Sequence, residues 1–183
     1  LNFKHKISTI FLDLQDNMTT TTSDSPNLLP LETLTVRGTH SQMGDAYGQH
    51  FKPKIKSFVE MRLSSAEKYF KDWQRGSVDE LLKRGTECWA MALEFDPASA
   101  REQEAIANAI GITPQRLYAT TNMTDVRDVV LLPDTSPPDQ DEGCTSALIP
   151  PGPHSSGLYG QTWDLNPPDI DFIIALHRLP DHG

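Results

Sequence analysis

The residues best suited to chemistry lie around Cys144, in the run Glu-Gly-Cys-Thr-Ser at positions 142–146. A thiol at this place can attack the carbonyl carbon of Gly143, which moves the acyl group from the amide nitrogen to sulfur. Water then hydrolyses the thioester and frees Cys144 as a new N-terminus. Gly143 suits this step because it has no Cβ to block the attack and tolerates a strained backbone. The run therefore predicts a nucleophile that is created by cutting the chain between Gly143 and Cys144.

The freed cysteine would carry a thiol and an α-amine on one residue. An α-amine has a pKa of roughly 8, so it can take the proton from the thiol near neutral pH. No separate histidine is then required as a base. We expect Cys144 to attack an amide or a thioester carbonyl and to pass the acyl group to an amine or to water.

A second motif, Gly-Gln-Thr-Trp-Asp, follows at positions 160–164. Together the two runs resemble the peptidase C45 family, the acyl-CoA:6-aminopenicillanic acid acyltransferase-like N-terminal-nucleophile hydrolases, which process themselves. The resemblance implies that Cys144 is the catalytic nucleophile and that Asp164 supports the active site. The two motifs add four supporting neighbours: Thr145, Gln161, Thr162 and Trp163.

A weaker match to the same family lies upstream. The family opens on a glycine-threonine pair followed by two spaced glycines, a pattern met here by Gly38, Thr39, Gly44 and Gly48. One position departs from the family, because Thr162 stands where the family carries an asparagine. A hydroxyl therefore replaces an amide beside the catalytic aspartate.

The resemblance also implies an α+β fold, in the form of the four-layer αββα sandwich of N-terminal-nucleophile hydrolases. The segment after the cut is too short to build two packed sheets, so we expect a fragment. We divide the chain into a disordered or artefactual N-terminus (1–30), a mostly helical pro-segment or alpha chain that ends in a proline-rich acidic loop (31–143), and the start of the catalytic beta chain (144–183). Because this fragment lacks the family's oxyanion-hole asparagine, we expect it to be inactive by itself.

Two alternatives stay open for Cys144. A lone cysteine is most often a small buried residue, which would make the chain a non-processing α+β binding protein. The other alternative is a thiol hydrolase whose base is His154 or His177, although no motif pairs either histidine with the cysteine. Asp164 can also be interpreted as a turn cap before Pro167 and Pro168.

The composition limits the classes of binding partner that we expect. The formal net charge of −9 argues against nucleic acid or an acidic membrane surface as a partner. The implied partners are a small-molecule acyl donor, an amine acceptor or water, and the alpha and beta chains of the processed precursor. No cofactor or metal is implied, and a CoA thioester would be a substrate. Cys88 and Cys144 give no disulfide framework and no apolar run could span a bilayer, so we expect a cytoplasmic protein.

Residues 31–121 are predicted to form a strand followed by helices. Alternation predicts a strand over 31–36, and a helix over 41–73 should be kinked or divided by Pro53. Helix start signals then recur at four places: Thr39 with Gln42, Ser77 with Glu80, Asp96-Pro97 and Thr113-Pro114. The corresponding later helices should end near Phe95, Ile110 and Thr121. The candidate core of the helix that starts at Ser77 consists of six residues: Leu81, Leu82, Cys88, Trp89, Ala92 and Leu93.

Strands are expected around the nucleophile. Segments 144–149 and 157–163 should pair as a hairpin across the Pro-Pro-Gly-Pro turn at 150–153. Further strands are expected over 129–132, where apolar and β-prone residues run together, and over 172–176. Gly44 and Gly48 lie one turn apart on the first helix, which predicts that another backbone approaches closely there.

Overall fold

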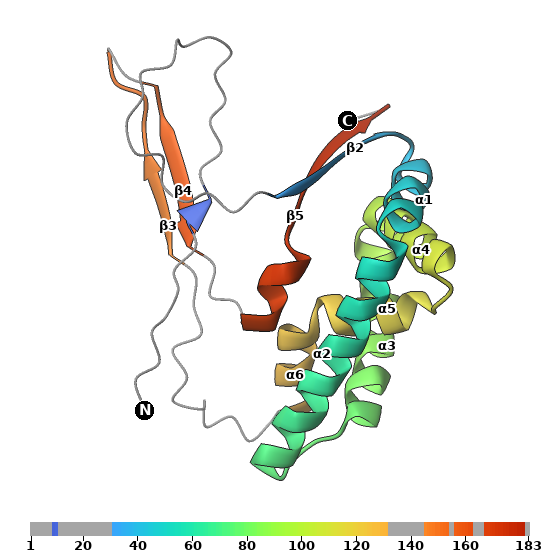
Figure 1. Cartoon of the computed structure of the whole chain (residues 1–183). Coiled ribbons are helices and arrows are strands. Elements are labelled where there is room, and N and C mark those ends of the chain that lie inside the picture. Colours follow the sequence, from blue (N-terminus) through green and yellow to red (C-terminus); the bar gives the residue numbers. More distant parts are fainter. Residues whose placement is uncertain (1–8, 11–30, 132–144, 154–155, 163–166, 182–183) are drawn as a thin grey trace. The chain divides into compact units, whose positions relative to one another are not determined.

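The computed structural model describes residues 9–10, 31–131, 145–153, 156–162 and 167–181 (Figure 1). The fold is mixed α+β. The chain divides into two compact units, one formed by residues 31–136 with 168–183 and the other by residues 1–30 with 137–167. No helix among the described residues has both the length and the apolar character needed to cross a bilayer.

The larger unit consists of helices beside a two-stranded sheet (Figure 1). Strand β2 (Glu32–Gly38) pairs in parallel with β5 (Ile174–Pro180), from Glu32 opposite Ile174 to Gly38 opposite Pro180. The helices that the structure describes in this unit are α1 (His40–His50), α2 (Lys52–Trp73), α3 (Val78–Phe95), α4 (Pro97–Ile110), α5 (Pro114–Thr121), α6 (Met123–Leu131) and the 3₁₀ helix η1 (Pro167–Phe172).

The helix starts follow the predicted caps. The Thr39 hydroxyl accepts a hydrogen bond from the Gln42 amide, and the Gln42 side chain accepts one from the Thr39 amide, which completes the predicted capping box. Ser77, Asp96 and Thr113 cap α3, α4 and α5 in turn. The division near Pro53 is also confirmed, since α1 ends at His50 and α2 begins at Lys52.

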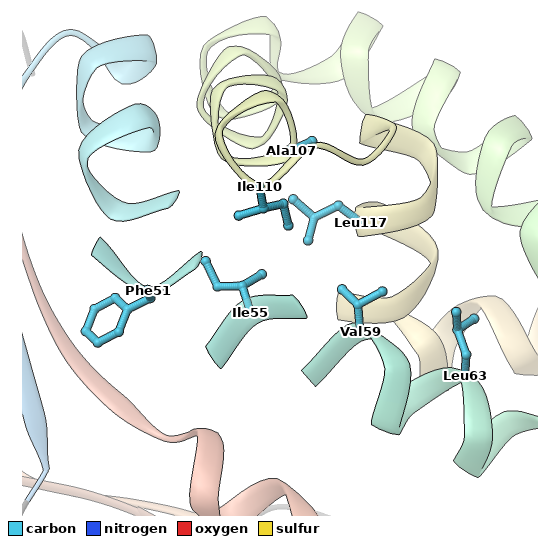
Figure 2. Packing of buried hydrophobic residues seen from close by; sticks show 7 residues of the cluster. All are labelled: Phe51, Ile55, Val59, Leu63, Ala107, Ile110 and Leu117. Carbon is cyan, nitrogen blue, oxygen red and sulfur yellow. The ribbon is translucent and has the colours of Figure 1, made fainter. Parts of the chain in front are cut away.

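The core of this unit lies where α2, α4 and α5 meet. Figure 2 shows Ile55, Ile110 and Leu117 converging from these three helices. The whole cluster consists of Phe51, Ile55, Val59, Leu63, Ala107, Ile110 and Leu117. A fully buried side chain of this size stabilises the fold by about 1.5–3 kcal/mol. A second cluster of buried residues lies where α2, α3 and α6 meet: Ala66, Phe70, Leu81, Met123 and Val126.

The two glycines of α1 lie against α4, as predicted. A Cβ added to Gly44 would lie 2.3 Å from the backbone oxygen of Glu102, and one added to Gly48 would lie 2.7 Å from the Cβ of Ala109. Real Cβ atoms do not approach other atoms this closely. The contact therefore requires glycine at both positions for a steric reason.

The smaller unit contains a three-stranded antiparallel sheet. Strand β4 (Leu158–Thr162) pairs with β3 (Ser146–Ile149) on one side and with β1 (Thr9–Ile10) on the other. The hairpin expected from the sequence is thus confirmed, with strands slightly shorter than expected. Apolar side chains of this hairpin remain open to solvent, with Leu148 75% exposed and Tyr159 56% exposed.

Three expectations were wrong. Residues 129–131, expected in a strand over 129–132, belong to helix α6, because Met123 and Val126 bury one face of that helix in the second cluster. Residue 132 lies outside the described residues. The last strand begins at Ile174, because Pro167 and Pro168 open a 3₁₀ helix that runs through Phe172. In α3, Leu93 is 41% exposed, while Leu81 and Trp89 are buried as expected.

Gly44→Ala tests the contact between α1 and α4. Alanine raises helix propensity by up to about 1 kcal/mol, but the added Cβ must displace the backbone of α4, and overpacking costs about 1–3 kcal/mol. We expect urea unfolding to show a net loss of about 1–2 kcal/mol. Gly160→Ala is the control, because a Cβ there meets nothing within 4 Å. Equal stability of the two variants would contradict the close packing.

Candidate functional site

The structure describes three of the predicted site residues, namely Thr145, Gln161 and Thr162. The cleavage pair Gly143 and Cys144, with Trp163 and Asp164, lies outside the described residues. The geometry available therefore concerns the hairpin that adjoins these positions in the chain.

Thr145 and Thr162 are joined by two short hydrogen bonds. The Thr162 amide donates to the carbonyl oxygen of Thr145 at 2.8 Å, and the Thr162 hydroxyl Oγ1 accepts from the Thr145 amide at 3.0 Å. The same hydroxyl also donates a longer hydrogen bond, of 3.4 Å, to the Thr145 carbonyl oxygen. The Thr162 hydroxyl thus holds the backbone of Thr145, the residue that follows Cys144 in the chain.

Gln161 has a different environment. Its Oε1 accepts a hydrogen bond from the Tyr159 hydroxyl at 2.9 Å, and Tyr159 and Gln161 share one face of β4. Because side chains alternate along a strand, Gln161 and Thr162 extend to opposite faces. The two predicted supporting residues therefore cannot serve one site from the same face.

The alternative base His177 and the second cysteine, Cys88, both lie in the larger unit. His177, on β5, is exposed, and His154 lies outside the described residues. Arg127 donates to the Asp128 carboxylate at 3.1 Å, and its guanidinium lies 4.7 Å from the centre of the Tyr69 ring. Arg127 and Asp128, neighbours on α6, thus form an ion pair. Cys88 is a half-buried free thiol in α3.

A charged cluster that the sequence did not indicate surrounds Glu102 of α4. Its Oε2 atom lies 3.1 Å from Nδ1 of His40, at the start of α1, and also accepts a hydrogen bond from Arg178 of β5. The Glu102 side chain is only 12% exposed. These partners are 62 and 76 residues distant in sequence, so no local pattern could have connected them. The cluster fixes β5 to the helices.

A second ion pair connects α2 with η1. Arg62 Nη2 lies 3.2 Å from Asp169 Oδ2, with the side chains 10% and 4% exposed. The Arg62 guanidinium also lies 5.1 Å from the centre of the Phe58 ring. Removing one partner of such a pair leaves a charge buried without compensation, which makes the pair costly to break. It anchors the segment that leads into β5.

Comparison with known proteins adds no assignment. No protein-family model matches the chain, and no curated protein matches it. Within the part of the chain that the structure describes, no group of three or more His, Cys, Asp or Glu side chains could hold a metal ion. The candidate site therefore rests on the two motifs and on the hairpin between them.

Thr162→Val tests the hydroxyl bond. Valine keeps the branched shape but cannot accept from the Thr145 amide, and a lost hydrogen bond of this kind costs about 0.5–1.5 kcal/mol. We expect hydrogen exchange at the Thr145 amide to become faster by about 2- to 10-fold. Tyr159→Phe, which removes another side-chain bond of the same hairpin, should leave that amide unchanged. An unaltered rate in Thr162→Val would show that the hydroxyl does not hold this backbone.

Glu102→Gln tests the charged cluster. The amide keeps the shape of the side chain but loses the charge that pairs with Arg178. Because that arginine is 44% exposed, we expect a loss of only about 1–2 kcal/mol in the free energy of unfolding. Glu104→Gln on the same helix is the control, since Glu104 forms no ion pair with any described residue. Similar unfolding curves for the two variants would exclude a stabilising role for the cluster.

Proposed function

We propose that the chain is the precursor of a self-processing amidohydrolase or acyltransferase of the N-terminal-nucleophile type, with Cys144 as the nucleophile. The observation that carries this proposal is the pair of hydrogen bonds between Thr145 and Thr162. These two residues adjoin Cys144 and Trp163 in the chain, so the hairpin register brings the ends of the two motifs into contact. Two motifs that serve one active site must lie close together in space, and this register allows that.

The first reaction is the cleavage of the precursor. The Cys144 sulfur attacks the carbonyl carbon of Gly143, the bond from that carbon to the Cys144 nitrogen breaks, and the nitrogen takes up the proton released by the thiol. Water then attacks the thioester. The products are a carboxylate on Gly143 and a free α-amine and thiol on Cys144.

The second reaction uses the new N-terminus. The α-amine takes the thiol proton, the sulfur attacks the carbonyl of an amide or an acyl thioester, and the amine proton passes to the leaving group. An amine or water then removes the acyl group from sulfur. The enzyme is a transferase if the acceptor is an amine and a hydrolase if it is water. Asp164 supports this site, and β3 and β4 supply the first core strands of an αββα sandwich.

Intact mass spectrometry of the protein expressed from its complete reading frame tests the proposal. We expect two chains, divided between Gly143 and Cys144, because the thiol and the scissile carbonyl are adjacent in the chain. Cys144→Ala should stay in one piece. Cys88→Ala is the matched control for loss of a thiol and should be processed like the parent protein.

An unprocessed parent protein that is folded by circular dichroism would contradict the proposal. It would leave Cys144 as a structural residue of a non-processing binding protein. Processing that persists in Cys144→Ala would contradict it equally, because the cut would then require another nucleophile or a contaminating protease.

A further inference from the structure

A cavity of about 200 Å³ lies in the larger unit, beside the core cluster. Six apolar side chains contribute to its wall: Phe51, Ile55, Phe58, Ile106, Leu117 and Phe172. Phe51, Ile55 and Leu117 are members of the cluster in Figure 2. These side chains come from α2, α4, α5 and η1 and from Phe51, which lies between α1 and α2. The cavity does not depend on how the two units are placed.

Aromatic rings dominate this wall. Tyr47 and Phe51 lie with ring centres 5.4 Å apart, and Phe58 meets Phe172 edge to face at the same distance. Rings favour edge-to-face and offset contacts with another ring. Apolar cavities of about 150 Å³ hold a benzene molecule, so the volume here suits a single six-membered ring with one small substituent.

The charged group at the cavity is already neutralised. Lys54 Nζ lies 2.8 Å from the Glu32 carboxylate and 5.8 Å from the centre of the Phe51 ring. A ligand carboxylate would have to displace Glu32 to reach this ammonium group. Thr121 is also occupied, since its hydroxyl donates to the Leu117 carbonyl oxygen at 3.0 Å. These contacts favour a neutral ligand.

Two polar groups of the wall are available for a ligand. Within the described residues, the Tyr47 hydroxyl makes no hydrogen bond, and the buried Oε1 atom of Gln103 accepts none. Burial raises the pKa of the Tyr47 hydroxyl, so it stays a neutral donor and acceptor at physiological pH. A ligand hydroxyl can both donate and accept, which matches an amide and a phenol together.

We propose that this cavity binds a neutral single-ring aromatic alcohol, with its ring against Phe51, Phe58 and Phe172 and its hydroxyl bonded to Gln103 and Tyr47. The aromatic wall selects the ring, the volume limits it to one, and the two polar groups select the hydroxyl. The paired Lys54 discriminates against acids of the same size.

Titration of the chain with phenol, followed by amide NMR spectra, tests the proposal. We expect a dissociation constant on the order of 1 mM for so small a ligand, with shifts centred on residues 103–106 and 117–121. Toluene has the same ring without the hydroxyl and should bind about 3- to 10-fold more weakly. The titration is done on Cys144→Ala, so that its outcome is independent of processing.

Two conservative variants give the decisive comparison. Tyr47→Phe and Gln103→Leu remove one polar group each and nearly keep the volume, so each should weaken phenol binding by about 3- to 10-fold and leave toluene unchanged. Tyr118→Phe, which removes a hydroxyl outside the cavity wall, should bind phenol like the parent chain. Tyr47→Phe adds no atom, so it should fold normally by circular dichroism.

Three results would overturn the proposal. The first is no phenol-dependent shift at concentrations of about 10 mM, well above the expected dissociation constant. The second is a set of shifts that lies away from the cavity wall. The third is equal phenol affinity in the parent chain, Tyr47→Phe and Gln103→Leu, which would show that the hydroxyl is not recognised.

Discussion

The larger unit depends on one steric constraint, the contact of α1 with the backbone of α4. Gly44 and Gly48 leave no room for a Cβ between the two helices. At this separation Glu102 reaches both His40 and Arg178, and the adjoining part of α4 supplies Gln103 and Ile106 to the cavity wall. Two residues that lack side chains thus allow the approach of α1 and α4 on which the charged cluster and one side of the cavity depend.

Most helix boundaries could be predicted because their signals are local. Asp96 is followed by proline and accepts hydrogen bonds from the amides of Ala98 and Ser99, all within one turn. Gly111 ends the same helix with φ of 80°, a conformation that glycine adopts without strain. The hairpin of β3 and β4 could also be predicted from the sequence, since its turn residues and both strands lie within twenty residues.

The predictions that failed, and the features that the sequence did not predict, depend on contacts between residues distant in sequence. The apolar run that ends α6 contains valines, which favour strands, but burial of Met123 and Val126 against α2 and α3 makes it helical. The parallel pairing of β2 with β5 and the ion pairs Arg62–Asp169 and Glu102–Arg178 join residues that no local motif connects. For the candidate site, spacing predicted the hairpin, but the hydroxyl contact of Thr162 required the structure.

The larger unit is built from two stretches of chain, 31–136 and 168–183, and the bond between Gly143 and Cys144 falls in the connection between them. The second stretch contributes a whole strand, paired over seven positions, and one partner to each of the pairs Arg62–Asp169 and Glu102–Arg178. A cut in the connection would sever none of these contacts. The product would be a nicked protein whose two polypeptides travel as one species in native chromatography and separate only on denaturation.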